Sequence, residues 1–348
     1  MIVLQNHVKK CVTSILSVII LLCILTVHLK HWAHVRDKSS TYKYDGPLGD
    51  YDDIDNEIGS HKERDLSRLI QLKINATPEC NLSQDKITSL NNVEEILNGF
   101  HECIDPIFAS FNGEARLWYD NWVKASRKCD YIDAYKNLNV NGIANGDEIK
   151  WIIYPRCREN NTHLSLGIGH DTLAEEKLKM HQPNTKFIGV DPMIDINYDI
   201  YTKNLQGSFF GFALSNETGL STFSVLRRHL YGPEEVTTLD VAYFFEKVLK
   251  IRRIDSMFLD IEGGEQFFFD YFHKGGKFDQ IGTVICQFNV ELHAGGIPNG
   301  YQKAYDFFKQ TLKDNRYIFM RGALHTPGFF KIYFVNVEDK ECVRKFLQ

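Results

Sequence analysis

Two glycines separated by one residue follow an apolar stretch in the segment HLSLGIGHD, residues 163–171. Gly167 and Gly169 have no side chain, so the backbone between them can adopt unusual dihedral angles and approach a bound molecule closely. The segment TLAEEKLKM that follows has the pattern of a helix, and the first turn of a helix offers free backbone N–H groups. The pattern predicts a cofactor-binding loop. The alternative is an ordinary turn between a strand and a helix.

A carboxylate ends the next predicted strand. The segment KFIGVDP contains Asp191, twenty residues after Asp171. In nucleotide-binding sheets, an acidic residue at the end of the second strand commonly accepts hydrogen bonds from ribose hydroxyl groups. We therefore expect Asp191 to bind a ribose, and we expect Asp191→Ala to abolish cofactor binding with little effect on folding. The alternative is that Asp191 caps the turn before Pro192.

Ionisable residues also follow two later predicted strands. The segment DSMFLDIEGGEQ contains Asp260, Glu262 and Glu265, and QFNVELH ends with Glu291 and His293. A hydroxyl substrate must lose a proton to a base of suitable pKa, and the candidates for this catalytic role are Asp260, Glu262 and His293. Histidine is included because it titrates near neutral pH. The alternative for His293 is a structural histidine at the end of a strand.

These residues lie in a region where strand and helix patterns alternate. The alternation begins near residue 150, and the segments YIFMRGALH and FFKIYFVNV close it as a predicted β-hairpin. This order predicts an α/β fold, a Rossmann-like doubly wound sheet that is mostly parallel and has helices on both faces. Ligands of such sheets bind at the carboxyl ends of the strands, where all the residues named above fall.

The chain before residue 150 is organised differently. Residues 1–10 form a short tail. Residues 11–29 contain no Asp, Glu, Lys or Arg, and their length matches a transmembrane signal-anchor helix, with a cleaved signal peptide as the alternative. Residues 30–79 are polar and predict a stem or linker, whereas residues 80–150 have helical spacing and predict a helical lead-in. Residues 151–348 form the remaining domain.

Composition and local motifs indicate the compartment and the partners. The net charge of −5 argues against a broad nucleic-acid-binding surface. N-x-S/T motifs occur at Asn75, Asn81, Asn160 and Asn216, and six cysteines lie outside the apolar segment. Both features favour a lumenal or extracellular glycoprotein with disulfides, whose pairing the sequence leaves open. No C-x-x-C motif occurs, and we predict no metal site.

Five segments, taken in order, resemble the FkbM-type methyltransferases that depend on S-adenosylmethionine, in particular a membrane-anchored or secreted branch found in animals. The segments are LSLGIGHDTLAEE, FIGVDP, VTTLD, IDSMFLDIEGGEQ and QFNVELH. The resemblance implies a class I methyltransferase fold and S-adenosylmethionine as the cofactor.

The resemblance also implies roles for individual residues. Gly167 and Gly169 would lie beneath the methionine part of the cofactor, and Asp171 at the start of the next helix. The resemblance further places Asp191 on the ribose, Ala213 and Leu214 near adenine, and Asp260 near the methionine amino group or the acceptor.

One position departs from the family pattern. Ser165 stands two residues before Gly167, where most class I methyltransferases have an acidic residue. An acidic residue there would pair with the positively charged amino group of the cofactor. Asp260 or another carboxylate would have to supply that charge here.

Together these features predict a single-pass membrane protein with a lumenal catalytic domain in the Golgi or endoplasmic reticulum, or a secreted form. It would be an O-methyltransferase that acts on a hydroxyl group of a glycan or of another molecule in the secretory pathway. One alternative is a metal-dependent glycosyltransferase, because an anchor with a stem is typical of that class and the acidic residues of 260–262 could bind a metal. The other is a non-catalytic binding protein with the methyltransferase fold, which Ser165 leaves open.

Overall fold

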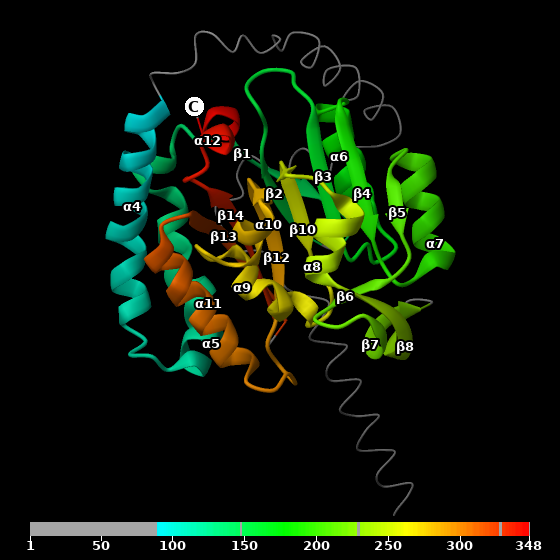
Figure 1. Ribbon diagram of the computed structural model, residues 1–348. Helices are drawn as coiled ribbons and strands as arrows, with labels where there is room; N and C mark the ends of the chain where they lie inside the picture. Colours follow the sequence, from blue (N-terminus) through cyan, green and yellow to red (C-terminus); the bar gives the residue numbers. More distant parts are fainter. Residues whose placement is uncertain (1–88, 147, 228–229, 327–328, 348) are drawn as a thin grey trace, which may run out of the picture. The chain divides into compact units, whose positions relative to one another are not determined.

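A seven-stranded sheet forms the centre of the fold (Figure 1). It is seen in a computed structural model that describes residues 89–146, 148–227, 230–326 and 329–347. The strand order is β13-β14-β12-β10-β3-β4-β5. The strands are β3 (Asn161–Leu166), β4 (Thr185–Val190), β5 (Ser208–Phe210), β10 (Ser256–Leu259), β12 (Gln287–His293), β13 (Tyr317–Thr326) and β14 (Phe329–Asn336).

The five strands from β12 to β5 run parallel, whereas β14 runs antiparallel to both of its neighbours. β4 and β5 lie on one side of β3, and β10 and β12 lie on the other. Ligands of open α/β sheets bind where the strand order reverses in this way, at the carboxyl ends of the strands. The predicted mostly parallel α/β sheet is therefore confirmed, as is the predicted hairpin of β13 and β14.

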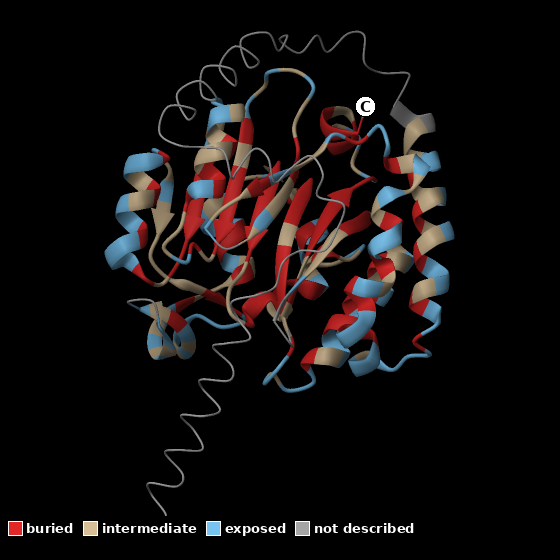
Figure 2. Cartoon of the chain, turned by 180° about the vertical axis from the view of Figure 1, so that it is seen from behind, coloured by how far each residue is buried: buried red, intermediate tan, exposed pale blue. Residues whose placement is uncertain are grey.

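Both faces of this sheet are covered (Figure 2). Successive residues of a strand point to opposite faces. In β4 and β10, Ile188 and Met257 belong to a large hydrophobic core, whereas Phe187 and Phe258 belong to a smaller core on the other face. Strands that are buried on both sides are expected of a parallel sheet between two layers of helices. The doubly wound arrangement follows from this alternation.

The helices are α4 (Ser89–Ala109), α5 (Ala115–Ser126), α6 (Leu173–His181), α7 (Ile194–Asp199), α8 (Val241–Tyr243), α9 (Phe269–Phe272), α10 (Lys277–Ile281), α11 (Gly300–Asp314) and α12 (Lys340–Phe346). Short 3-10 or π-helical turns span Arg127–Tyr131, Asp133–Tyr135, Ile200–Asn204, Phe244–Leu249 and Gly264–Phe268. The segments DVAYFFEKVLK and EQFFFDYF, whose pattern predicts regular helices, are thus built largely from such turns.

The lead-in helices belong to the main hydrophobic core. Trp118 and Trp122 of α5 are fully buried and lie edge-on to Phe308 of α11, with ring centroids 4.9 and 6.0 Å away. All described residues fall in one compact unit. The expected boundary between residues 150 and 151 falls within a strand, so the helical part and the α/β part are not separate domains among these residues.

The last part of the expected lead-in is a hairpin. β1 (Val140–Ala144) and β2 (Ile149–Ile153) pair antiparallel, although residues 140–150 were expected to be helical. The Asn145–Gly146 dipeptide between two apolar segments is a strong hairpin signal, because both residues readily adopt the backbone conformation of a tight turn. This β1–β2 hairpin lies against the sheet and becomes part of the site described below.

Two disulfides between described residues join distant parts of the fold. Cys103 of α4 is bonded to Cys129, with 5.8 Å between the Cα atoms, and Cys286 is bonded to Cys342 of α12, with 5.1 Å between them. The second bond attaches the C-terminal helix to the segment just before β12. These are two of the pairings that the sequence left open.

No helix of the described residues is long and apolar enough to cross a membrane. The predicted tail (1–10), signal-anchor (11–29) and stem (30–79) lie outside the described residues. The signal-anchor therefore stays a prediction.

Candidate active site

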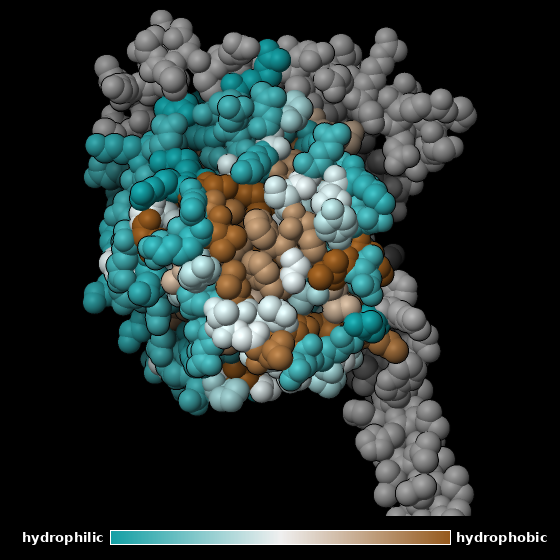
Figure 3. All heavy atoms as spheres, turned by 45° about the vertical axis from the view of Figure 1, so that its right-hand side comes forward, coloured by the Kyte–Doolittle hydropathy of each residue, from teal (hydrophilic) through white to brown (hydrophobic). Residues whose placement is uncertain are grey.

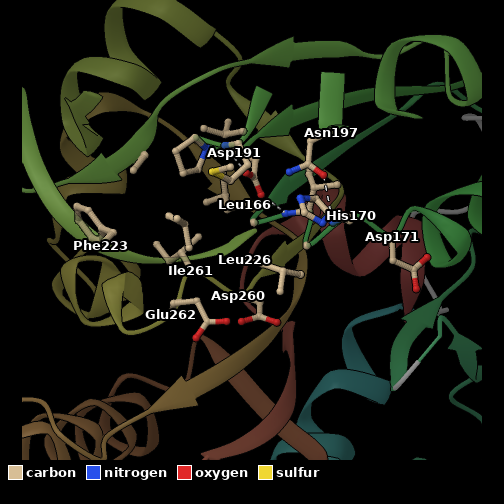
Figure 4. Close-up of a pocket in the computed structure, with 18 of the residues that line it drawn as sticks. Leu166, His170, Asp171, Asp191, Asn197, Phe223, Leu226, Asp260, Ile261 and Glu262 are labelled. Carbon is tan, nitrogen blue, oxygen red and sulfur yellow. Dashed lines mark hydrogen bonds between the residues drawn. The ribbon is translucent and has the colours of Figure 1, made fainter. Parts of the chain in front are cut away.

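A cavity of about 400 Å³ lies at the carboxyl ends of β3, β4 and β10 (Figure 4). Its size is within the range of sites for small molecules and cofactors. Eight of the nine predicted site residues line it, namely Gly167, Gly169, Asp171, Asp191, Ala213, Leu214, Asp260 and Glu262. The ninth, His293, lies next to Glu262. The fold thus brings together residues that are more than a hundred positions apart in the sequence.

The two glycines of the loop after β3 have different functions. Gly167 has a φ of +80°, and a Cβ atom added there would lie 1.7 Å from the carbonyl oxygen of Asp260. Gly169 has a φ of +62°, but a Cβ atom added there would have no neighbour within 4 Å. Gly167 therefore allows β3 and β10 to approach closely, and Gly169 leaves space beside the cavity. The next residue, His170, donates its backbone N–H to Asn197 Oδ1 at 3.0 Å (Figure 4).

Asp191 holds this loop in place. Its side chain accepts a hydrogen bond from the backbone N–H of Ile168 at 2.8 Å and another from Met193 at 2.7 Å. Burial raises the pKa of Asp191, and these hydrogen bonds oppose the rise. A carboxylate has about four acceptor positions, so it can still accept from a ribose hydroxyl. Asp191 thus caps its turn and also faces the cavity, so the two readings of the sequence are compatible.

Asp171 connects three elements. It accepts hydrogen bonds from the backbone N–H of Leu173, in the first turn of α6, at 2.8 Å and from Gly146, in the β1–β2 hairpin, at 2.7 Å. The carboxylate therefore fixes the hairpin against the start of α6. Its contacts give it a positioning function at the edge of the cavity.

The β1–β2 hairpin forms a wall of the cavity that sequence reasoning missed. Asn289 of β12 exchanges two hydrogen bonds, both 2.7 Å, with the backbone of Trp151, and Gln287 makes the same pair with Ile153 at 2.8 and 3.0 Å. The two amide side chains thus bind the backbone of β2 as a neighbouring strand would. They place Glu148 and Lys150 at the cavity, 2.6 Å apart.

Ionisable side chains gather at one end of the cavity, where Figure 4 shows Asp260 and Glu262 side by side. Glu265 is buried and accepts hydrogen bonds from the backbone N–H groups of residues 261 and 263. It also lies 3.1 Å from Nδ1 of His293, whose Nε2 lies 3.5 Å from Glu262. Glu291, the fifth member, lies close to Asp260. Together these five residues are called the acidic end of the cavity.

The acidic end changes the pKa values of its members. Burial alone would lower the pKa of His293, but its hydrogen bond to Glu265 and the nearby carboxylates outweigh burial and raise the pKa to about 9. Burial and the charge of Glu291 hold the pKa of Asp260 well above its usual value. Burial also raises the pKa of Glu262, against the effect of His293. His293 is therefore a cation at neutral pH, and burial disfavours ionisation of its neighbours Asp260 and Glu262.

Residues 103–319 match the Methyltransferase FkbM domain. This match covers more than half of the chain. The chain belongs to the FkbM methyltransferase family. Its cofactor is S-adenosylmethionine, and the family is one of methyltransferases and not of glycosyltransferases. The match begins within α4 and ends within β13, so it covers the last part of α4 and the whole of α5 as well as most of the sheet.

Several solved structures are similar to this methyltransferase at low sequence identity. A precorrin-6y C5,15-methyltransferase from Geobacter metallireducens is 11% identical, covers 52% of this chain and 83% of its own, and has a TM-score of 0.30. Fibrillarin from Aeropyrum pernix, solved with natively bound S-adenosyl-L-methionine, is 15% identical, covers 51% and 67%, and has a TM-score of 0.29. No curated protein sequence matches the chain.

The cavity of the methyltransferase fits the cofactor that the family implies. Leu166 and Leu214 line the cavity with apolar side chains that would suit the adenine and the methionine chain, and Asp191 would be the acceptor for the ribose. Oδ1 of Asp260 is buried and has no hydrogen-bond partner among the described residues. A buried acceptor without a partner is costly unless a ligand satisfies it. Carboxylates also favour the positive charge of a sulfonium group electrostatically.

Three side chains at the acidic end could together contact a cation. One ligand atom each of Asp260, Glu291 and His293 lies within 4.8 Å of the others. However, Nζ of Lys331 already lies 3.1 Å from Glu291 and 2.6 Å from Glu148. A lysine in this position supplies the positive charge that a metal ion would otherwise bring.

A separate small sheet also contributes to the wall of the cavity. It consists of β6 (Ala213–Ser215), β8 (Leu230–Asp240) and β7 (Gly219–Arg227) in that order. From the β7–β8 ribbon, Phe223, Leu226 and Tyr231 line the cavity. Nothing in the sequence indicated that the ribbon would reach the site.

Apolar side chains are exposed on this side of the molecule. Figure 3 shows them in the middle of one face, inside a hydrophilic rim. Ile194 and Ile196 of α7 are 52% and 43% exposed, and Leu220 and Leu230 of the β7–β8 ribbon are 66% and 73% exposed. An acceptor that approaches the cavity past the ribbon therefore meets apolar as well as polar surface.

Proposed function

We propose that this methyltransferase transfers a methyl group to a hydroxyl oxygen of a glycan in the lumen of the secretory pathway, and that residues 11–29 anchor it in the membrane. The observation that supports a hydroxyl acceptor is the acidic end of the cavity. Two of its carboxylates, Asp260 and Glu262, line the same cavity as the loop assigned to the methionine part of the cofactor. Carboxylates can accept hydrogen bonds from sugar hydroxyl groups, and one of them can take up the proton that the acceptor loses.

Glu262 is the base in this proposal. When bound, S-adenosylmethionine would supply a methyl group on a positively charged sulfur, which would leave with the electron pair of the broken bond. The acceptor oxygen forms the new bond to carbon, and its proton passes to the Glu262 carboxylate. Glu262 lines the cavity with 29% of its side chain exposed, and burial raises its pKa. A base whose pKa approaches the working pH is the more effective one.

His293 serves a different purpose from the one its residue type first suggests. Because its pKa is raised to about 9, it holds a proton at neutral pH and has no free lone pair to accept another. Its ring lies between Glu265 and Glu262. We assign it the positioning of Glu262, which leaves the carboxylates as candidates for the base.

The disulfide bonds support the proposed lumenal location. The bonds Cys103–Cys129 and Cys286–Cys342 are of a kind that persists in secretory compartments and is rare in the cytosol. The four N-x-S/T motifs agree with a lumenal protein. Glycan hydroxyl groups are abundant acceptors there, which is why the proposal names them.

Methyl transfer from labelled S-adenosylmethionine by the full chain tests the acceptor. Oligosaccharides and glycoproteins are expected to be labelled as methyl ethers, and amine or carboxylate acceptors are not. Glu262→Gln should reduce the rate by about 100-fold or more, as expected for loss of a general base. Glu246→Gln, the same change at an exposed residue, is the control. Labelling of amines alone, or full activity of Glu262→Gln, would contradict the proposal.

Glycosylation in cells tests the compartment. A lumenal chain should lose a glycosidase-sensitive mass increment when Asn160 or Asn216 is replaced by glutamine. An unmodified wild-type chain whose thiols all react with alkylating reagents would refute the lumenal location.

A further inference from the structure

Ser165 and Glu175 together occupy the place of one missing acidic residue. Ser165 is fully buried in β3, two residues before Gly167, where an acidic residue would otherwise face the amino group of the cofactor. Its hydroxyl group donates a hydrogen bond to Oε1 of Glu175 at 2.6 Å. The structure therefore brings a carboxylate to the vicinity of position 165 from another element.

Glu175 is the third residue of α6, and its side chain points inward rather than to solvent. It is 3% exposed and lines the cavity. Among the described residues, no Lys, Arg or His nitrogen forms an ion pair with it within 4.0 Å. A carboxylate buried in this way is costly unless a positive charge compensates it.

Two other carboxylates near the glycine loop, Asp171 and Asp191, have backbone partners of their own. Asp171 and Asp191 each accept two hydrogen bonds from backbone N–H groups. Asp260 lies at the acidic end, beside Glu262, the proposed base, and its buried Oδ1 has no hydrogen-bond partner among the described residues, which makes it the rival candidate for the amino group. This leaves Glu175 as the carboxylate that lines the cavity near the glycine loop with one side-chain hydrogen bond and no ion pair among the described residues.

We propose that the Glu175 carboxylate, held by the Ser165 hydroxyl group, binds the positively charged amino group of the methionine part of S-adenosylmethionine. The inference rests on the assignment of this cavity to the cofactor. A serine and a glutamate ten positions apart thereby do what one acidic residue does elsewhere. Lys150 lines the same cavity and offers a positive charge to the carboxylate of the methionine part.

The protonation of Glu175 agrees with this role. Burial raises its pKa, and Lys150 and the Ser165 hydrogen bond only partly oppose the rise. A bound ammonium group stabilises the ionised form and lowers the pKa. Cofactor binding should therefore release a proton from the fraction of molecules in which Glu175 is protonated.

Isothermal titration calorimetry on the full chain in detergent tests the inference. The probes are S-adenosylhomocysteine, which keeps the amino group, and its α-deamino analogue, which lacks it. Glu175→Gln should weaken binding of S-adenosylhomocysteine by at least about 10-fold, as expected for a lost hydrogen bond between charged groups. The Kd of the deamino analogue should be unchanged.

Glu176→Gln is the matched control. Glu176 is the next residue of α6, and it accepts hydrogen bonds from Thr172 at 2.8 Å and from Asn204 at 2.9 Å. It does not line the cavity. The same chemical change one position along should leave the Kd of both probes unchanged.

A second measurement needs no variant and therefore holds even if Glu175→Gln does not fold. Wild-type titrations at about pH 6 in buffers of different ionisation enthalpy give the number of protons released on binding. S-adenosylhomocysteine should release protons, and the deamino analogue should release fewer. Equal release by both probes would overturn the inference.

The remaining outcomes separate the assignment of Glu175 to the amino group from the assignment of this cavity to the cofactor. If Glu175→Gln binds S-adenosylhomocysteine like the wild type while Asp260→Asn loses affinity, the amino group lies at Asp260 and the inference about Glu175 is wrong. If Glu175→Gln, Asp260→Asn and Asp191→Asn all bind it like the wild type, the cofactor lies outside this cavity and the site assignment itself fails.

Discussion

Replacing His293 with glutamine removes a positive charge that the folded protein holds more firmly than the unfolded chain does. The pKa of His293 is raised from 6.5 to about 9 in the folded state. Below pH 6.5 both states are protonated, and the stabilisation is fully present. Between pH 6.5 and about 9 the unfolded chain loses the proton while the folded protein keeps it. The stabilisation is therefore lost as the pH rises through this window.

The size of the effect follows from the shift. One pKa unit corresponds to about 1.4 kcal/mol, so the charge of His293 contributes on the order of 3 kcal/mol at pH 6. The His293 side chain is only 8% exposed, so solvent screens its interactions with Glu265 and Glu262 weakly.

Denaturant unfolding of the full chain at about pH 6, 7.5 and 9.5 measures this contribution. The free energy of unfolding of His293→Gln should lie about 3 kcal/mol further below that of the wild type at pH 6 than at pH 9.5. His273→Gln is the control, because burial lowers the pKa of His273, which gives it no such loss between pH 7 and 9.5. Parallel pH profiles of the wild type and His293→Gln would refute the reasoning.

Four further substitutions test the loop and its supports. Gly167→Ala should lower the free energy of unfolding by about 3 kcal/mol or more, because its Cβ would meet the carbonyl oxygen of Asp260. Gly169→Ala should lower it by about 1 kcal/mol, from backbone strain alone. Thermal unfolding of the two variants compares these effects. Asp191→Ala should lower the free energy of unfolding by roughly 2 kcal/mol or more, because two backbone donors lose their acceptor. It should also weaken S-adenosylhomocysteine binding. An unchanged melting temperature would contradict the first expectation. Asn289→Ala should speed amide hydrogen exchange in β2 while exchange in β13 keeps its wild-type rate.

The sheet could be predicted from the sequence because its signals are local. Apolar segments such as 185–190 and 256–259 each read as a strand without knowledge of their neighbours. The same holds for Gly167, Gly169 and Asp191, whose spacing along the chain reflects the loops that follow two adjacent strands. The prediction for Asp191→Ala was incomplete, because the sequence does not show which backbone donors a carboxylate will meet.

The missed parts of the site depend on contacts across long distances in the chain. Glu175 stands in the segment LAEEKLK, where nothing distinguishes it from Glu176, and only the position of α6 beside β3 turns one inward. The β1–β2 hairpin had a readable Asn145–Gly146 signal that the helical pattern before it obscured. Its attachment to Asn289 had none, because the two segments are 138 positions apart.

The burial of the lead-in helices has a consequence for biosynthesis. Trp118 of α5 lies 5.9 Å from Phe330 of β14, measured between ring centroids, and Asn92 of α4 donates a hydrogen bond to the carbonyl group of Leu347 at 2.8 Å. Helices made early thus find their partners only when the last strands leave the ribosome. Until then their aromatic faces are exposed, which is the condition under which chains aggregate or require chaperones. The C-terminal end therefore governs when the whole protein can finish folding.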